Sequence, residues 1–116
     1  MNNHPSNISE CFDVLDSIVT SSEDQNWFKD SSENDVVLLT HNGLGEWIRN
    51  NWNLWNKNSI LYLYFNKLGL SHADDMSTLI IRSYHRMINN KELDIIEQVN
   101  KFTLFWENKK KSYGPI

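Results

Sequence analysis

The chain has 116 residues, of which 40% are hydrophobic and 12% aromatic, with four glycines and two prolines. This length and composition predict one globular domain, and the scarcity of glycine and proline argues against a β-sandwich or barrel, which needs many tight turns. No stretch approaches 18 consecutive apolar residues, so we expect no membrane span. The first residues lack the basic region and apolar run of a signal peptide, and the single cysteine, Cys11, is typical of a reducing compartment such as the cytoplasm.

Charge is unevenly distributed along the chain, whose net charge is −4. Residues 9–35 contain eight acids and one base, Lys29, and therefore carry −7, whereas the remainder carries +3. Such an acidic third would attract a basic partner protein and repel nucleic acid. The alternative is that these acids only occupy solvated helix faces and the first turns of helices. The candidate partner-binding residues are Glu23, Asp24, Asp30, Glu33 and Asp35.

The N-terminal part of the chain is predicted to be helical. Residues 8–20 place apolar side chains at helical spacing behind a capping residue, Asn7, and a short second helix is expected over residues 22–30. Ser32 precedes an acid by three residues and so predicts another helix start. The run at residues 36–39 is rich in strand-forming residues, but it has no obvious partner strand, so we expect it to lie in a helix.

The middle of the chain contains two expected breaks. Gly43 and Gly45 are predicted to interrupt the chain, with a new helix starting after them. Residues 53–58 are expected to form a loop, and residues 59–68 a helix that Gly69 ends.

Two longer helices are predicted after this point. Ser71 and Asp74 resemble a capping box ahead of a strongly amphipathic helix that ends at residues 89–90. A last helix is expected over residues 91–108, followed by a frayed basic tail at residues 109–116. Its expected apolar face consists of Ile95, Ile96, Val99, Phe102 and Trp106. The predicted fold class is therefore all-α, a compact bundle of six to seven short helices in one domain.

No catalytic residue, metal site or cofactor is predicted. His72, Asp74 and Asp75 could in principle bind a divalent metal, but no second ligand cluster accompanies them, and acids near a helix start are favoured by its free N–H groups. Cys11 has no neighbouring base, and no serine has the glycines of a nucleophile elbow. His85 is expected on a solvated helix face.

Arg49 is the polar residue with the most specific setting. It follows Trp47 by two residues, and a guanidinium stacked on an indole and bonded to Asp74 or Asp75 would join two helix ends. Alternatively, Arg49 could form a binding hot spot with Trp47 and Trp55, because tryptophan and arginine dominate such sites. We call the following residues the motif cluster, which is either structural or binding: His41, Trp47, Arg49, Asn50, Trp55, Asp74 and Asp75.

These motifs resemble those of a small, uncharacterised bacterial domain family. Its pattern is a glycine turn, Trp-Ile-Arg-Asn, a Trp-x-Leu-Trp loop and a Gly-(Leu/Ile)-x-His-x-Asp-Asp-Met-Ser helix start. The corresponding segments here are residues 43–45, 47–50, 52–55 and 69–77. The resemblance implies a compact helical domain.

In size, acidity and helical character the chain is also similar to the immunity proteins of bacterial toxin–immunity systems, including those of contact-dependent growth inhibition. That resemblance implies an immunity protein that binds a basic toxin, above all a ribonuclease, and covers its active site. It implies no chemistry by this chain and no contact with nucleic acid or membrane. Two alternatives stay open: a helical module whose Trp/Arg/Asp cluster is structural, and a metal-dependent hydrolase that uses His72, Asp74 and Asp75.

Overall fold

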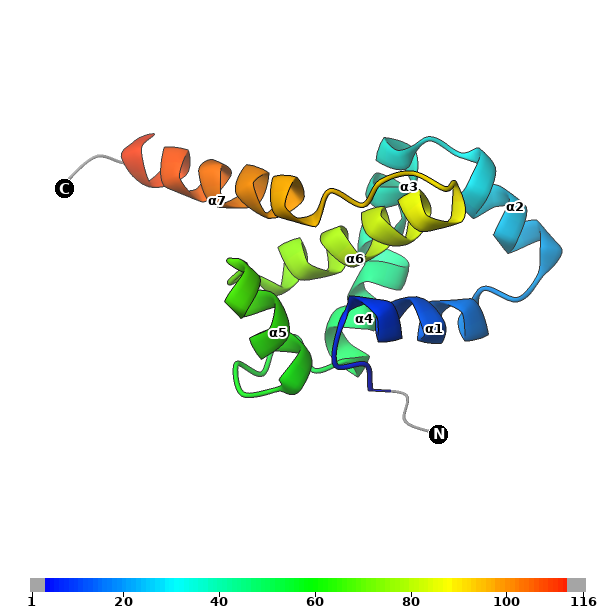
Figure 1. Cartoon of the computed structure of the whole chain (residues 1–116), viewed down its shortest axis with the longest axis horizontal. Coiled ribbons are helices and arrows are strands. Elements are labelled where there is room, and N and C mark those ends of the chain that lie inside the picture. Colours follow the sequence, from blue (N-terminus) through cyan, green and yellow to red (C-terminus); the bar gives the residue numbers. More distant parts are fainter. Residues whose placement is uncertain (1–3, 113–116) are drawn as a thin grey trace.

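The chain folds into helices only, as the sequence predicts: residues 4–112, which the computed structural model describes, contain no strand. In chain order the helices are α1 (Ile8–Ile18), α2 (Ser22–Asp30), α3 (Glu33–Thr40), α4 (Glu46–Asn51), α5 (Ile60–Leu68), α6 (Ala73–Ile88) and α7 (Ile95–Ser112). A π-helical segment, His41–Gly45, connects α3 to α4. Figure 1 shows α6 in the middle of the bundle and α7 reaching beyond the other helices on one side.

Side-chain caps start four of these helices. The side-chain oxygens of Asn7, Ser21, Ser32 and Ser59 accept hydrogen bonds from backbone N–H groups three residues later. Such caps satisfy N–H groups that have no partner within the helix. The starts expected behind Asn7 and Ser32 are confirmed, and residues 36–39 lie inside α3 as predicted.

The prediction that Gly43 and Gly45 break the chain is wrong. Both lie in the π-helical segment, and the backbone runs on without interruption from α3 into α4. Gly45 has helical angles, and a Cβ atom on it would lie 3.0 Å from Nη1 of Arg49 and 3.2 Å from the carbonyl oxygen of Thr40. This glycine therefore provides room for close packing. Gly69, whose φ is +121°, does end α5, since such an angle favours glycine.

The start of α6 also differs from the prediction. Ser71 and Asp74 do not form a capping box: the residue at the cap position is His72, and its side chain makes no capping bond. The hydroxyl of Ser71 instead lies 3.1 Å from Nδ1 of His72. Sequence spacing alone placed the cap one residue too early.

The last helix begins four residues later than predicted. Asn90 and Asp94 have φ values of 57° and 51°, which end α6 and keep residues 91–94 out of a helix. At the other end, Lys109, Lys110 and Lys111 continue α7, so this part of the predicted frayed tail is helical. Residues 113–116 of that tail lie outside the described part of the chain.

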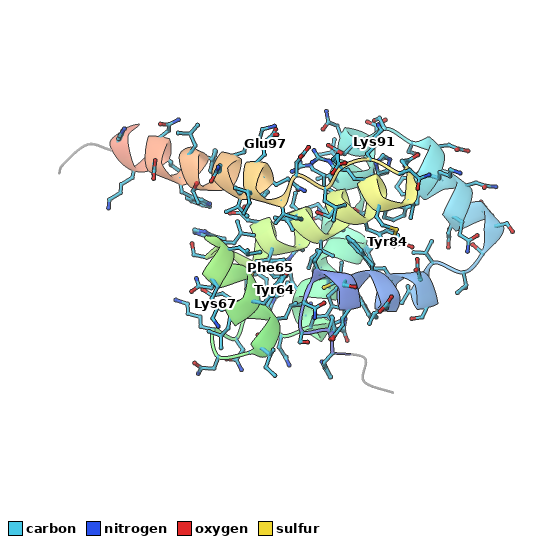
Figure 2. All side chains as sticks on the ribbon, viewed as in Figure 1. Tyr64, Phe65, Lys67, Tyr84, Lys91 and Glu97 are labelled. Carbon is cyan, nitrogen blue, oxygen red and sulfur yellow. The ribbon has the colours of Figure 1, made fainter. Side chains whose placement is uncertain are left out.

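Helix α6 supplies the centre of the core. The predicted apolar stripe of this amphipathic helix consists of Met76, Leu79, Ile80, Tyr84, Met87 and Ile88. Its first four residues are buried and its last two are half-buried. The other helices each contribute buried side chains, among them Cys11, Leu15, Phe28, Val36, Ile48, Phe65 and Val99. Figure 2 shows Phe65 and Tyr84 turned into the bundle and Lys67 turned away from it.

On α7, Ile96 is 62% exposed and does not join the predicted apolar face, whereas Val99 is buried and Ile95 and Phe102 are partly buried against the core. Among the described helices, none combines the length and apolarity that crossing a bilayer would need.

Candidate functional site

Arg49 lies at the centre of a buried polar network. The residue is 5% exposed; its Nη1 donates to the hydroxyl of Ser77 at 2.9 Å and its Nη2 to the backbone carbonyl of His41 at 3.1 Å. Nε lies 3.2 Å from Oδ1 of Asp74, close enough for an ion pair although the N–H does not point at the carboxylate. The expected burial of Arg49 is thus confirmed, and Asp74 is the acid that lies beside it, in an ion pair that lacks the expected hydrogen bond. The expected contact with an indole is absent, since Arg49 stacks on no ring among the described residues.

The tryptophans of the motif cluster lie on the surface beside this network. Trp47 is partly exposed and packs edge-on against the buried ring of Trp52, with 5.8 Å between ring centroids. Trp55 is 61% exposed, and its indole N–H donates to the amide oxygen of Asn50 at 2.8 Å. The cluster therefore divides into a buried arginine network and an exposed tryptophan–asparagine pair.

Asp75 belongs to a different contact, which fixes α7 to the start of α6. One carboxylate oxygen accepts a hydrogen bond from the indole N–H of Trp106 at 2.8 Å, and the ring of His72 stacks on the same indole at 3.8 Å between centroids. Burial raises the pKa of Asp75 above its ordinary value, although the Trp106 bond and nearby His72 act against this shift.

The three residues of the metal-dependent alternative do not converge. Asp74 faces Arg49, whereas His72 and Asp75 face Trp106, and no group of three metal-ligating side chains gathers within residues 4–112. The same nitrogen of His72, Nδ1, lies 3.1 Å from the hydroxyl of Ser71 and 3.9 Å from a carboxylate oxygen of Asp75.

Cys11 is fully buried, although cysteine is in general a reactive nucleophile. Burial raises the pKa of its thiol well above the ordinary value, so the thiolate that a nucleophilic role requires is disfavoured.

The face of α6 that carries His85 is not solvated, contrary to prediction. His85 is 3% exposed and its Nε2 donates to the backbone carbonyl of Ser31 at 2.7 Å. On the same side, Glu33 accepts from Arg86 Nε at 2.6 Å and lies 3.5 Å from Arg82 Nε. Helix α3 and the end of α2 cover this face, which the periodicity of α6 alone could not show.

The five candidate partner-binding acids fall into two groups. Glu33 is half-buried and neutralised by Arg82 and Arg86, and the hydrogen bond from Arg86 lowers its pKa. Within the described part of the chain, the others are exposed and make no ion pair. These four unpaired acids are Glu23, Asp24, Asp30 and Asp35.

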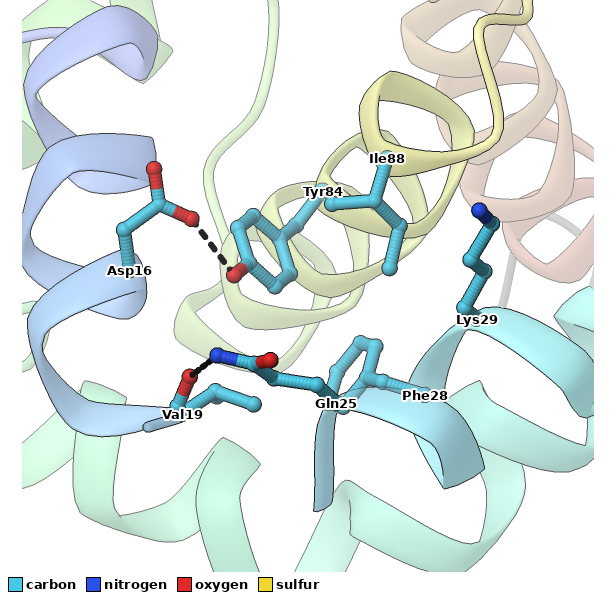
Figure 3. Close-up of a pocket in the computed structure, with 7 residues that line it drawn as sticks. All are labelled: Asp16, Val19, Gln25, Phe28, Lys29, Tyr84 and Ile88. Atoms are coloured by element: carbon cyan, nitrogen blue, oxygen red, sulfur yellow. Dashed lines mark hydrogen bonds between the residues drawn. The ribbon is translucent and has the colours of Figure 1, made fainter. Parts of the chain in front are cut away.

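A cleft opens within the acidic third, between α1, α2 and α6. It has a volume of about 290 Å³ and is lined by Asp16, Val19, Gln25, Phe28, Lys29, Tyr84 and Ile88. The hydroxyl of buried Tyr84 donates to Oδ1 of Asp16 at 2.7 Å, as Figure 3 shows. This bond joins residues 68 positions apart, and burial together with the bond to Asp16 raises the pKa of the phenol.

Sequence reasoning missed this cleft. The one signal available was a tyrosine within the apolar stripe of α6, because a buried phenol needs a hydrogen-bond partner. The identity of that partner, Asp16, depends on how α1 packs against α6.

A second hollow, of about 450 Å³, lies beside the loop after α4. Its lining is rich in uncharged amides, including Asn53, Asn56 and Asn58, and it borders His4 and Pro5 near the N-terminus. It offers a partner no net charge, so its chemistry differs from that of the cleft between α1, α2 and α6.

Comparison with known proteins gives a family for the chain. Residues 4–88 match a family described as a domain of unknown function, DUF6794, and since the match covers most of the chain, the chain belongs to this family. The match agrees with the expected membership of a small, uncharacterised domain family. It ends at the last residue of α6, so α7 lies outside it. No curated protein and no solved structure matches the chain.

Proposed function

We propose that this member of the DUF6794 family is an immunity protein: in the cytoplasm it binds a basic protein toxin, such as a ribonuclease domain, and covers its active site. The observation that carries the proposal is the set of four exposed acids on α2 and α3, Glu23, Asp24, Asp30 and Asp35, which no base of the described chain neutralises. The chain itself contributes no chemistry in this proposal.

Unpaired surface acids suit this role because they cost little to keep in water and act over distance. Their field raises the rate at which a basic protein and this surface meet, and it disfavours nucleic acid, which is the toxin's own substrate. Glu33 cannot serve in the same way, since its charge is already committed to Arg82 and Arg86. The two arginines also offset part of the −7 that residues 9–35 carry.

The burial of Arg49 favours a structural role for most of the motif cluster. A guanidinium that is 5% exposed and bonded to Ser77 and His41 has little left to offer a partner. This supports an arrangement in which the arginine network shapes the bundle while binding takes place elsewhere. Trp55 is the more exposed of the cluster's two tryptophans, and it is the aromatic member best placed to contact a partner.

The test is to search beside the gene for a sequence that encodes a basic nuclease domain and to co-express that domain with the chain. We expect growth to be restored and the two purified proteins to bind with a dissociation constant near nanomolar or lower, about −12 kcal/mol or more favourable. An immunity protein needs such affinity because it must outcompete the toxin's substrate at low cellular concentrations. The proposal would be contradicted if the chain failed to protect cells and the two purified proteins did not bind even at micromolar concentrations.

A further inference from the structure

The polar end of the cleft between α1, α2 and α6 presents hydrogen-bond acceptors. Oδ1 of Asp16 accepts a hydrogen bond from the hydroxyl of Tyr84, and no donor within the described residues bonds the second carboxylate oxygen. The side-chain nitrogen of Gln25 donates to the carbonyls of Val19 and Thr20 at 3.1 and 3.4 Å, so the amide oxygen is left over. A ligand that binds here has to bring donors, and Asp16 favours donors that are positively charged.

Beside these acceptors the walls of the cleft are apolar. Val19, Phe28 and Ile88 line it, and the ring of Phe28 packs edge-on against Tyr84 at 5.4 Å between centroids. A volume of about 290 Å³ lies at the small end of ligand pockets, which span roughly 300–1,000 Å³. It suits a single long side chain better than an extended ligand, with an aliphatic stem against the apolar walls and a charged end at Asp16.

Charge around the cleft points the same way. Asp16 lies within the acidic third, which carries −7, and the one base of that segment, Lys29, lies across the cleft from Asp16 in Figure 3. Cations are therefore drawn to the Asp16 side of the cleft. The hydrogen bond from Tyr84 holds the Asp16 carboxylate at its edge.

We infer that this cleft receives an arginine side chain of the basic partner, an inference that rests on the proposed function. Arginine fits better than lysine because its planar guanidinium carries several donors, and the free acceptors of the cleft, one oxygen of Asp16 and the amide oxygen of Gln25, come from two different helices. Asp16 and Gln25 are then recognition residues, and Tyr84 is a positioning residue that acts through Asp16. Asp16 and Gln25 are exposed in the free chain, so a partner can reach them, and arginine is among the residues enriched in binding hot spots.

The experiment needs no toxin, since the isolated side chain serves as the probe. Nα-acetyl-arginine methylamide is titrated into the full chain while NMR follows the side-chain amide of Gln25 and the backbone amides of Val19 and Phe28. We expect saturable shifts confined to the cleft, with a dissociation constant in the millimolar range. The citrulline analogue has nearly the same shape without the charge, and it should bind at least about tenfold more weakly.

Variants of the chain make the test specific. Asp16→Asn retains an acceptor for Tyr84 but loses the charge, and it should weaken the arginine probe about tenfold or more. Asp13→Asn changes an exposed acid on the same helix that does not line the cleft, and it should have no effect. Lys29→Gln should leave binding unchanged or strengthen it, because it removes a like charge. Amide spectra of each variant confirm that it is folded.

Four results would overturn the inference: shifts that map outside the cleft, equal binding of citrulline, no loss in Asp16→Asn, or weaker binding in Lys29→Gln. These outcomes are separable from failure of the proposed function. If the chain protects against the toxin and Asp16→Asn protects and binds it equally well, the immunity role stands and the arginine anchor is wrong. If the probe binds as expected but no toxin does, the cation site stands and the partner is of another kind.

Discussion

Arg49 of α4 and Ser77 of α6 are joined by a hydrogen bond of 2.9 Å between two buried side chains, 28 residues apart in sequence. The same guanidinium bonds the carbonyl of His41, where the π-helical segment begins. The hydroxyl of Ser77 in turn donates to the backbone carbonyl of Asp74. Three elements thus meet at one guanidinium, which gives the conspicuous tryptophan–arginine motif a structural purpose.

Replacing Arg49 by alanine should destabilise the fold strongly. The change leaves buried groups of His41 and Ser77 without their donor, and we expect a loss of about 3 kcal/mol or more in the free energy of unfolding. Asp74→Asn is the matched control: the Asp74 side chain is 60% exposed, so its loss should cost under about 1 kcal/mol. Urea denaturation measures both. An Arg49→Ala protein as stable as wild type would show that the network is not structural.

The two glycines of the π-helical segment should respond in opposite ways to alanine. A Cβ at Gly43 meets nothing within 4 Å. Gly43→Ala should therefore stabilise the protein by about 0.5–1 kcal/mol, because alanine lowers the conformational entropy of the unfolded chain. At Gly45 a Cβ would press on Arg49 and on the Thr40 carbonyl, so Gly45→Ala should cost about 1–3 kcal/mol. Melting temperatures of the two variants test this, and equal shifts would contradict the packing role of Gly45.

The parts of the fold that the sequence predicts correctly are those that depend on neighbours along the chain. Asn7 and Ser32 cap their helices because each side chain accepts a hydrogen bond from the backbone N–H group three residues later in the sequence. The apolar stripe of α6 is visible for the same reason, since residues three and four apart share a face. Such features need no knowledge of the tertiary structure.

The errors arise where another element determines the outcome. Gly45 is typical of a break, but packing against Arg49 keeps it helical. His85 appears solvated beside two arginines until α3 covers that side of α6. The cleft escaped prediction for the same reason, because Asp16 and Tyr84 come together only when α1 docks on α6.

Glu33→Gln should weaken the protein at neutral pH but not in acid. The pKa of Glu33 is lowered below its ordinary value of 4.5, and the main cause is the hydrogen bond that its carboxylate accepts from Arg86. The stabilisation from this carboxylate is therefore present above that pH and is lost as the pH falls through the lowered pKa. We expect a loss of about 1–3 kcal/mol near pH 7.

Thermal denaturation of wild type and Glu33→Gln across pH measures this effect, with Asp35→Asn as the control. Asp35 has no ion pair among the described residues, so its loss should cost under about 1 kcal/mol. A stability difference for Glu33→Gln that stays constant with pH would argue against the ion cluster.

Asp75→Asn should be at least as stable as wild type at about pH 8. Burial raises the pKa of Asp75 above its ordinary value of 3.8, so its favourable, protonated form is lost as the pH rises through the raised pKa. Asparagine carries no charge to desolvate and retains an oxygen for the indole N–H of Trp106. The advantage should vanish in acid, where Asp75 is neutral. A large loss of stability at about pH 8 would show instead that the charge itself holds α7.

The last prediction concerns the unpaired acids of α2 and α3 in the proposed complex. Reversing Glu23, Asp24, Asp30 and Asp35 to lysine should slow association with a basic toxin more than it speeds dissociation, because exposed charges act mainly before contact. The wild-type rate should fall as salt rises, since the Debye length shrinks from about 30 Å at 0.01 M to about 8 Å at 0.15 M. The reversed chain, whose net charge changes by +8 from −4 to +4, should repel a basic toxin, so its association rate should no longer fall as salt rises and should rise instead.

A second reversed chain separates the position of these acids from their number. It changes four exposed acids outside the acidic third: Glu46, Glu92, Glu97 and Glu107. Both variants alter net charge equally, so a slower rate in the first variant alone would locate the encounter surface on α2 and α3. Equal slowing would mean that only net charge matters. The first variant should still fold, since its acids are exposed, although each acid lost from a helix start costs about 0.3–1 kcal/mol. If the first variant folds, protects cells and associates at the wild-type rate, inhibition stands but the interface lies elsewhere.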